Sequence, residues 1–221
     1  MGRTIGVIHA TTLSLEPMSA ALERALPDAG VRNVLDDSLL TDLQAAGELT
    51  DALRARIERL IEHLLHDGVD AVQLACSGFA PVVDAARDRH AVPIHKPDDA
   101  MYREVVAAGY GHVGILGTVP AALELAAGQV AAFGREAGRE VTVTTVCRPE
   151  GMAAAQAGDD ERLEQAMTDA AREAIAEGAD GLALAQYSLA RAAGPVTGAA
   201  EGRPVHTGPD AAAARLERAL R

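Results

Sequence analysis

Aromatic side chains are nearly absent from this chain, whose 221 residues include no Trp, three Tyr and two Phe. Proteins that bind single-stranded nucleic acids usually stack the bases on aromatic rings, and such stacking platforms are scarce here. The formal net charge of −12 also repels a phosphate backbone. The composition therefore argues against a nucleic-acid partner, and it requires a core built from Ala, Val, Leu and Ile.

Cysteine is also scarce, because the chain has only Cys76 and Cys147. Two cysteines in a chain of this size do not form a disulfide framework, which is typical of a reducing compartment. No apolar run approaches the length of about 20 residues that a membrane-spanning helix needs. The N-terminal segment lacks the hydrophobic region of a signal peptide. We therefore expect a soluble cytoplasmic protein that does not associate with membranes.

The sequence repeats itself at an offset of about 110 residues. Three matched pairs occur in the same order: IGVIHATT (5–12) with VGILGTVP (113–120), GVDAVQLACSGFAPVVDAA (68–86) with GADGLALAQYSLARAA (178–193), and VPIHKPDDA (92–100) with RPVHTGPDA (203–211). The second pair places Cys76 opposite Gln186. The chain therefore consists of two similar halves, and only one of them offers a thiol at this position.

Short β-branched apolar runs alternate with longer segments rich in Ala, Leu, Glu and Arg, a pattern typical of βα units and a mostly parallel sheet. Strands are expected near residues 3–9, 31–36, 70–75, 92–95, 112–117, 141–147, 180–185 and 203–206. Helices are expected near 15–26, 49–67, 79–89, 98–108, 120–137, 159–177 and 209–220. These elements predict an α/β protein with one lobe formed by 1–97 plus 208–221 and a second lobe formed by 98–207.

Several helix ends are marked by their residue types. Thr50 or Asp51 can cap the helix 49–67, and Gly68 can end it. Asp98 and Asp210, each preceded by Pro, are candidate N-caps of the helices that follow the fourth strand of each half.

Ligands bind to open parallel sheets at the carboxyl ends of the strands. In this chain those ends carry mainly small and hydroxyl side chains: 9–12, 36–38, 76–78, 95–96, 117–118, 147, 186–188 and 206–207. Hydroxyl groups and the N–H groups of helix N-termini are suited to bind a carboxylate.

Cys76 stands between a predicted strand and a predicted helix. A thiol at a helix N-terminus has a lowered pKa and a raised reactivity, because the oriented amides stabilise the thiolate. Burial as a small apolar side chain is the alternative interpretation. No helix start follows Cys147 in the same way, and we expect that cysteine to be structural.

Other motifs give no cofactor or metal site. Residues 109–114 match G-x-G-x-x-G but precede a strand, which is the reverse of the dinucleotide-binding context. His63 and His66 have helical spacing but no evident third metal ligand. His9, His95 and His206 each fall at a predicted strand end, where they either bridge loops by hydrogen bonds or belong to a site.

The strand-end segments together resemble the aspartate/glutamate racemase superfamily, especially its hydantoin-racemase-like branch. The resemblance is carried by IGVIHATTLS (5–14), LDDSLL (35–40), GVDAVQLACSGFAP (68–81), VPIHKPDDAM (92–101), GHVGILGT (111–118) and GADGLALAQYS (178–188). It implies two pseudosymmetric α/β lobes with the active site in the cleft between them. It also implies a cofactor-free transfer of a proton at a carbon next to a carboxylate, and a homo-oligomer, a dimer or larger.

In racemases of this superfamily, one cysteine from each lobe faces one side of the reacting carbon. Cys76 matches the first-lobe cysteine, whereas Gln186 stands at the position of the second and departs from the pattern. A carboxamide offers no acid or base at neutral pH. By resemblance and position, the residues expected to bind the substrate are Thr11, Thr12, Asp37, Ser77, Gly78, Thr118, Tyr187, Ser188 and His206.

Three functions are compatible with this pattern. The first is an isomerase or racemase-like enzyme that acts on a small carboxylic acid, with the thiolate of Cys76 as base or nucleophile and Gln186 orienting the substrate or stabilising an enolate-like oxygen. The second is a lyase or decarboxylase that uses Cys76 for one proton transfer. The third is a catalytically inactive relative that binds a small carboxylate.

Overall fold

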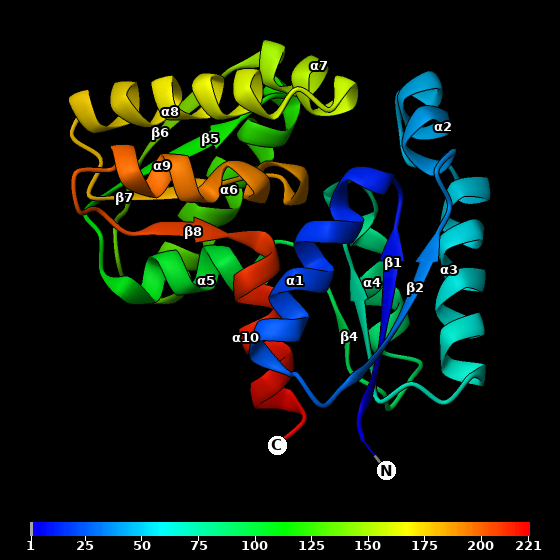
Figure 1. Ribbon diagram of the computed structural model, residues 1–221. Coiled ribbons are helices and arrows are strands. Elements are labelled where there is room, and N and C mark those ends of the chain that lie inside the picture. Colours follow the sequence, from blue (N-terminus) through cyan, green and yellow to red (C-terminus); the bar gives the residue numbers. More distant parts are fainter. Residues whose placement is uncertain (1) are drawn as a thin grey trace. The chain divides into compact units, whose positions relative to one another are not determined.

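Each half of the chain folds into a parallel sheet of four strands with helices on both faces (Figure 1). The computed structural model describes residues 2–221. The chain forms two compact units: Met1–Pro97 with Ala212–Arg221 is the first, and Asp98–Ala211 is the second. This architecture confirms the predicted α/β class.

The sheet of the first unit has the strand order β2-β1-β3-β4, and all its neighbours are parallel. Its strands are β1 (Thr4–His9), β2 (Gly30–Leu35), β3 (Ala71–Leu74) and β4 (Ile94–His95). The helices are α1 (Leu15–Ala25), α2 (Leu39–Ala46), α3 (Asp51–His66) and α4 (Ala80–Arg87), with the short 3₁₀ turns η1 (Thr12–Ser14) and η2 (Ser77–Phe79).

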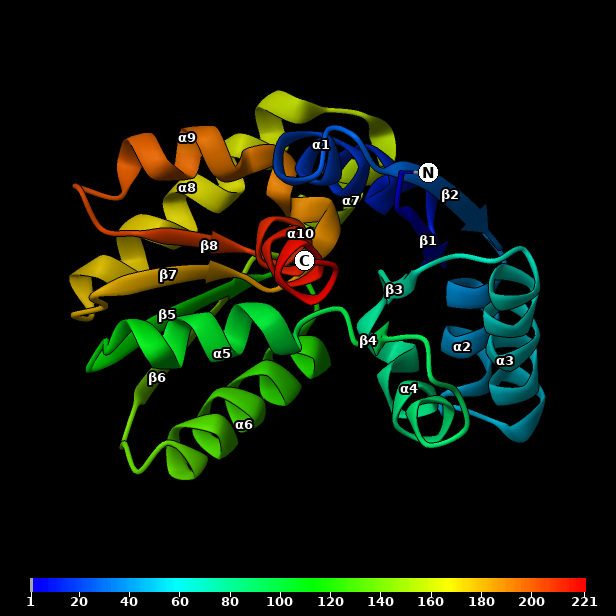
Figure 2. The same cartoon turned by 90° about the horizontal axis from the view of Figure 1, so that it is seen from below.

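Both faces of this sheet are covered by apolar helix surfaces. On one face, Ile57 and Ile61 of α3 and Val83 of α4 belong to the same buried cluster as Val72 and Leu74 of β3. Figures 1 and 2 both show α1 and the C-terminal helix α10 (Gly208–Ala219) along the other face. Burial on both faces explains why the central strands β1 and β3 are almost continuously apolar, whereas the edge strand β2 is mostly exposed and contains Arg32 and Asn33.

The helix α3 begins and ends as its residue types predict. The side chain of Thr50 accepts a hydrogen bond from the backbone N–H of Leu53 at 3.3 Å, so Thr50 is the N-cap. Gly68 adopts a φ of 76°, the left-handed conformation that ends a helix.

The sheet of the second unit repeats the first, with the order β6-β5-β7-β8 and parallel pairing throughout. Its strands are β5 (His112–Gly117), β6 (Thr142–Cys147), β7 (Gly181–Leu184) and β8 (Val205–Thr207). The helices are α5 (Asp99–Ala108), α6 (Pro120–Glu136), α7 (Pro149–Ala157), α8 (Asp160–Ala176) and α9 (Ala193–Ala199), with the 3₁₀ segment η3 (Tyr187–Ala192). Helices α5 and α6 cover one face of this sheet, and α8 and α9 cover the other (Figure 1). The repeat in the sequence is therefore a repeat of topology.

The helix that follows the fourth strand of each sheet joins the other unit. After β4 the chain enters α5, which belongs to the second unit, and after β8 it enters α10, whose residues from Ala212 onward belong to the first. Thr207 caps α10, because its Oγ1 accepts from the N–H of Asp210 at 3.2 Å and donates to the carboxylate of Asp210 at 2.6 Å. The prediction that Asp210 is the N-cap is therefore wrong: the helix begins earlier, at Gly208.

Three helices were not predicted from the sequence, namely α2, α7 and α9. Each is short, and α9 contains Gly and Pro in the sequence AGPVTGA. Gly and Pro have poor helix propensity, so α9 is stabilised by its packing against α8 and β8. Helices α2 and α7 consist mostly of good helix formers and were missed because they are short.

Glycines at equivalent places in β1 and β5 allow a helix to approach the sheet closely. A Cβ added to Gly114 would lie 2.7 Å from the Cβ of Ala174 and 2.8 Å from a methyl group of Leu182, whereas one added to Gly6 would meet the flexible side chain of Leu64 at 2.8 Å. We expect Gly114→Ala to lower the free energy of unfolding by about 1–3 kcal/mol, because Ala174 can move only with its helix. The matched change Gly6→Ala should cost less, since Leu64 can adopt another rotamer. Urea denaturation of both variants measures the difference, and equal losses would contradict this explanation.

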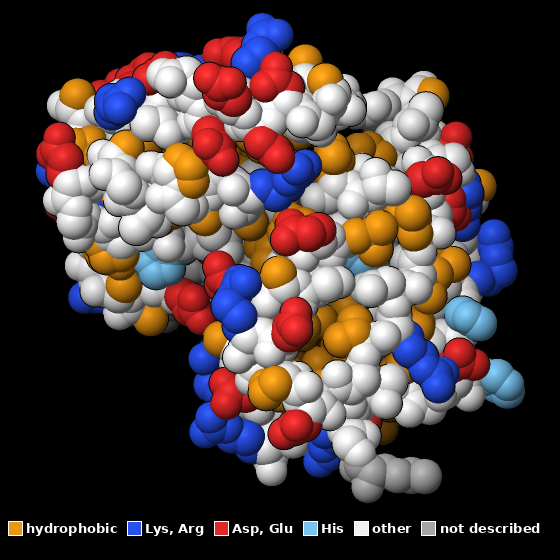
Figure 3. All heavy atoms as spheres, viewed as in Figure 1, with side chains coloured by type: hydrophobic (Ala, Val, Ile, Leu, Met, Phe, Trp, Pro, Cys, Tyr) orange, Lys and Arg blue, Asp and Glu red, His pale blue; other side chains and the backbone are white. Residues whose placement is uncertain are grey.

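Among residues 2–221, no helix is both long enough and apolar enough to cross a lipid bilayer. Acidic and basic side chains are interspersed on the face of the molecule shown in Figure 3. On this face the acidic excess of the sequence is therefore part of a mixed, solvated surface.

Candidate active-site residues

Cys76 directly follows β3 and stands at the N-terminal end of η2, with α4 beginning at Ala80. The thiol belongs to no disulfide bond and is half-buried, and it packs against the core cluster of the first unit. Ser77 is half-buried and Gly78 is exposed. A Cβ on Gly78 would lie 2.5 Å from a methyl group of Leu43 in α2, so the side chain of Leu43 would have to move to admit it. The structure thus places Cys76 at the entrance of a helix, as the sequence predicts.

The loop after β1 carries Thr11 and Thr12. Thr11 is half-buried, and its side chain caps η1 by accepting from the N–H of Leu13 at 3.4 Å. Thr12 is exposed. Both threonines therefore lie at the carboxyl edge of the first sheet. They follow β1, and Cys76 follows the neighbouring strand β3.

Asp37 is exposed in the loop between β2 and α2, and that loop is fixed by Arg56 of α3. The guanidinium of Arg56 donates to Ser38 Oγ at 2.6 Å and to the carboxylate of Asp42 at 2.7 Å, and it forms an ion pair with Asp36. Sequence reasoning missed Arg56, because nothing distinguishes it from the other arginines on the polar face of the helix.

Gln186 and Thr118 are joined at the carboxyl edge of the second sheet, where they follow the neighbouring strands β7 and β5. The side-chain oxygen of Gln186, Oε1, accepts hydrogen bonds from the backbone N–H and the hydroxyl of Thr118, each at 2.8 Å. Gly117 keeps this space open, since an added Cβ would meet Leu123 at 2.8 Å and Gln186 Oε1 at 3.5 Å.

These two bonds orient the carboxamide of Gln186. Because Oε1 is held by two donors of a buried residue, the amide nitrogen Nε2 is the end that remains for a ligand. This nitrogen carries two hydrogens and accepts none, so Gln186 offers hydrogen-bond donors only. The N–H and the hydroxyl of Thr118 both donate to Gln186, so Thr118 has no further donor for a ligand. In this arrangement it orients the amide that could bind one.

Tyr187 and Ser188 follow Gln186 in η3, and both are buried, at 4% and 7% exposure. Burial raises the pKa of Tyr187 well above 10, and the nearby Asp98 and Tyr102 raise it further. The phenol is therefore neutral and holds its proton at physiological pH.

His95 and His206 occupy equivalent register positions, since His95 pairs with Gln73 in β3 and His206 pairs with Ala183 in β7. The ring of His206 contacts Tyr110, with Nε2 3.0 Å from the phenol oxygen, and burial lowers its pKa. Tyr110 lies before β5, at the amino-terminal end of the sheet, whereas Gln186 follows the carboxyl end of β7. The imidazole of His206 therefore pairs with Tyr110 and not with Gln186. Burial, followed by the charges of Arg215 and Arg87, lowers the pKa of His95 to about 4. Both histidines are therefore neutral at pH 7.

Cys147 ends β6 and packs against the core cluster of the second unit. Burial, followed by the charge of Glu150, raises the pKa of this thiol. A thiol with a raised pKa is a weak nucleophile and base at neutral pH. The expectation that no helix start follows Cys147 is wrong, because α7 begins at Pro149. The raised pKa and the packing of this thiol are nevertheless consistent with the expected structural role.

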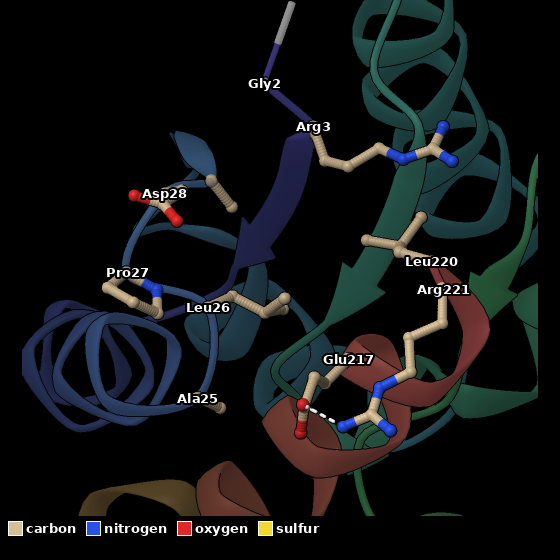
Figure 4. A pocket seen from close by; sticks show the side chains of 10 residues that line it. Gly2, Arg3, Ala25, Leu26, Pro27, Asp28, Glu217, Leu220 and Arg221 are labelled. Carbon is tan, nitrogen blue, oxygen red and sulfur yellow. Dashed lines mark hydrogen bonds and ion pairs between the residues drawn. The ribbon is translucent and has the colours of Figure 1, made fainter.

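The described residues contain no group of three or more His, Cys, Asp or Glu side chains placed to hold a metal ion. A hollow of about 310 Å³ lies in the first unit (Figure 4). It is lined by Gly2, Arg3, 25–29, Glu217, Leu220 and Arg221. These residues precede β1 or end α1 and α10, so the hollow is remote from the carboxyl ends of the strands where Cys76 lies.

Solved structures of amino-acid racemases share this fold of two parallel α/β units. The glutamate racemase of Thermus thermophilus shares 20% identity with the chain at a TM-score of 0.68, covering 99% of this chain and 80% of its own. The aspartate racemase of Picrophilus torridus shares 16% identity at a TM-score of 0.74, covering 99% and 94%. A mutant of arylmalonate decarboxylase shares 20% identity at a TM-score of 0.63, covering 97% and 93%.

The sequence itself matches the Asp/Glu/Hydantoin racemase family over residues 5–216, and the chain belongs to this family. The resemblance drawn from the sequence is thereby confirmed. Among proteins with curated functions, none matches the sequence significantly.

Proposed function

We propose that this protein is a cofactor-independent isomerase, racemase-like in its chemistry, that acts at the carbon next to the carboxylate of a small acid. Cys76 supplies the single thiolate, as base or nucleophile. Membership of the Asp/Glu/Hydantoin racemase family and the position of Cys76 at a helix entrance support this assignment. The hydroxyl groups of Thr11, Ser77 and Ser188 are the proposed anchors of the carboxylate.

The observation that carries the proposal is the fixed carboxamide of Gln186. Its Oε1 is occupied by Thr118, so Nε2 presents two N–H donors where the racemase pattern has a second thiol. Such donors stabilise negative charge that develops on oxygen in a transition state. In the proposed step, the Cys76 thiolate takes the α-proton, and the electron pair moves onto the carboxylate or a conjugated carbonyl. Gln186 then donates a hydrogen bond to the resulting enolate oxygen.

A single thiol limits the outcome of this step. The proton returns from the same side of the carbon, or it is delivered to a different atom of the enolate, which isomerises the substrate. Rapid inversion at one carbon needs a second acid on the opposite face, and a carboxamide is not one. We therefore propose isomerisation or same-face exchange in preference to two-thiol racemisation.

A lyase or decarboxylase is the second candidate, because the fold also matches that of arylmalonate decarboxylase. In that reaction the bond from the α-carbon to a carboxylate breaks, CO₂ leaves, and the thiol of Cys76 protonates the resulting carbanion. Gln186 would stabilise the same enolate oxygen in this reaction, so the geometry of the amide does not distinguish the two candidates.

Proton exchange in D₂O distinguishes these functions. The protein is incubated with both enantiomers of aspartate and glutamate, with a hydantoin and with an arylmalonate, and the recovered compounds are analysed by mass spectrometry and NMR. An isomerase introduces deuterium at the α-carbon of recovered substrate or yields a labelled isomer, whereas a decarboxylase labels only the product. If carboxylates bind but none is labelled or converted, the enzymatic proposal is wrong and the protein is a carboxylate-binding relative.

We further propose that the protein works in the cytoplasm, because a reducing compartment keeps the Cys76 thiol in its reduced form. We also propose that it forms a homo-oligomer, a dimer or larger. Light scattering coupled to size-exclusion chromatography measures its mass, and a mass of 22.8 kDa, that of one chain, would contradict the oligomer.

A further inference from the structure

A chain of hydrogen bonds runs through the buried imidazole of His9 to the loop that follows β1. His9 is fully buried at the end of β1, and its Nδ1 lies 2.8 Å from Ser14 Oγ. The hydroxyl of Ser14 donates in turn to the backbone carbonyl of Thr11 at 3.0 Å. On the other side of the ring, Nε2 lies 3.0 Å from the side chain of Asn33 in β2.

The directions of these bonds follow from counting hydrogens. Ser14 has one hydroxyl hydrogen, and it is given to the carbonyl of Thr11. Nδ1 of His9 must therefore be the donor to Ser14 Oγ, because two acceptors cannot share this contact. Burial lowers the pKa of His9, so the ring is neutral with its hydrogen on Nδ1. Nε2 is then an acceptor, so the side-chain amide of Asn33 must turn its NH₂ group, and not its oxygen, toward the ring.

This chain determines the conformation of the loop at the carboxyl edge of the first sheet. The carbonyl of Thr11 is held by Ser14, and the side chain of Thr11 is held by the N–H of Leu13. Thr11 is thus fixed at its backbone and at its side chain, and both bonds close the same turn, η1. The imidazole of His9, which is buried and hydrogen-bonded on both sides, therefore holds η1 in place through Ser14.

The second half of the chain has no equivalent of the hydrogen bonds from His9 through Ser14 to Thr11. The register position of His9 in β1 corresponds to Gly117 in β5, which has no side chain to hold the following loop. There, Thr118 is held by Gln186 instead. The histidine is therefore not a general requirement of this fold, and it points to a task specific to the loop after β1.

We propose that His9 is a positioning residue for substrate binding: through Ser14 it holds Thr11 and Thr12 in the orientation that receives the carboxylate of the acid. This inference rests on the proposed function, in which Thr11 contacts that carboxylate. His9 itself touches no substrate, since it is buried, and it takes no part in proton transfer.

Ser14→Ala removes the bridge without opening a large cavity. We expect the Kd for malonate, used as a carboxylate probe, and the KM for any acid that is turned over to rise about tenfold, the effect of losing one hydrogen bond that orders the binding loop. The kcat value should change less than twofold, because Cys76 and Gln186 are untouched. Hydrogen exchange of the peptide that contains residues 10–16 should accelerate in the free protein.

Two further variants separate positioning from a general effect on stability. His9→Asn keeps a side-chain N–H near the place of Nδ1, so we expect it to retain the malonate affinity within about threefold, whereas His9→Leu should behave like Ser14→Ala. Ser19→Ala in α1 is the matched control, because it makes the same change on the adjacent helix, and it should leave Kd unchanged.

The outcomes distinguish this inference from the proposed function. If the wild type binds malonate and Ser14→Ala binds it equally well, the positioning role is wrong while the enzymatic proposal stands. If malonate binding weakens in Ser14→Ala but no acid is exchanged or converted by the wild type, the positioning role stands and the enzymatic proposal is wrong. If the wild type binds neither malonate nor any acid of the panel, both are wrong.

Discussion

Cys76→Ala is expected to lower the turnover of any acid that the protein converts by about 10³-fold or more, the usual effect of removing an acid–base group. The physical reason is that no other side chain described at the strand ends can replace the thiolate. The phenol of Tyr187 is buried with a raised pKa, the pKa values of the buried His95 and His206 are lowered, and Gln186 has no ionisable group.

The measurement is the rate of deuterium incorporation or of product formation for the acid that is active in the exchange experiment. Cys147→Ala is the matched control, because it removes the other free thiol, and we expect it to retain turnover within about threefold. Cys76→Ala should also retain carboxylate binding, since the anchoring hydroxyl groups remain. Full activity of Cys76→Ala would show that the catalytic assignment of this thiol is wrong.

Gln186→Glu is expected to lower turnover by about 10²- to 10³-fold, the effect of removing a donor that stabilises an oxyanion. The replacement is chosen because one carboxylate oxygen can still accept the two hydrogen bonds of Thr118, so the fold is preserved. The second oxygen replaces Nε2, so that a repulsive charge stands where two N–H donors stood. The variant therefore exchanges the donors for a negative charge while it keeps the contact with Thr118.

Two other variants control this result. Thr118→Val keeps its backbone N–H but loses the hydroxyl, so the amide of Gln186 is held by one bond, and we expect a loss of about tenfold. Gln186→Cys introduces a second thiol and should produce racemisation if this position faces the reacting carbon. If Gln186→Glu is as active as the wild type, or gains a new acidic limb in its pH profile, the group at this position works as an acid or base and the donor role is wrong.

The positions of the eight strands could be predicted from the sequence, because each is a short segment with β-branched residues between turn signals, even in β2 and β6, which carry several polar residues. The repeat at about 110 residues also gave the matched topology of the two sheets, since each matched segment became the same strand in its sheet. Local capping was predictable at Thr50 and Gly68, where one side chain or one backbone angle decides the helix end.

Elements that depend on their neighbours were not predictable. Helix α9 contains Gly and Pro, has a weak local preference and forms against α8 and β8, whereas α2 and α7 are too short for their periodicity to stand out. Thr207 caps α10 instead of Asp210 because the helix begins earlier than the proline suggested. Arg56, which fixes the loop around Asp37, has no local signal, because its partners come from β2 and α2.

The sequence by itself determined the α/β class, the internal repeat, the family and the strand-end positions of Cys76 and Gln186. These depend on residue types and spacing along the chain, which local patterns record. Only the tertiary structure decided which end of the Gln186 amide is available, that Tyr187 is buried, and that His9 holds the loop after β1 through Ser14. Those facts depend on which side chains meet after the chain has folded, and the direction of a hydrogen bond or the burial of a ring leaves no pattern in the sequence.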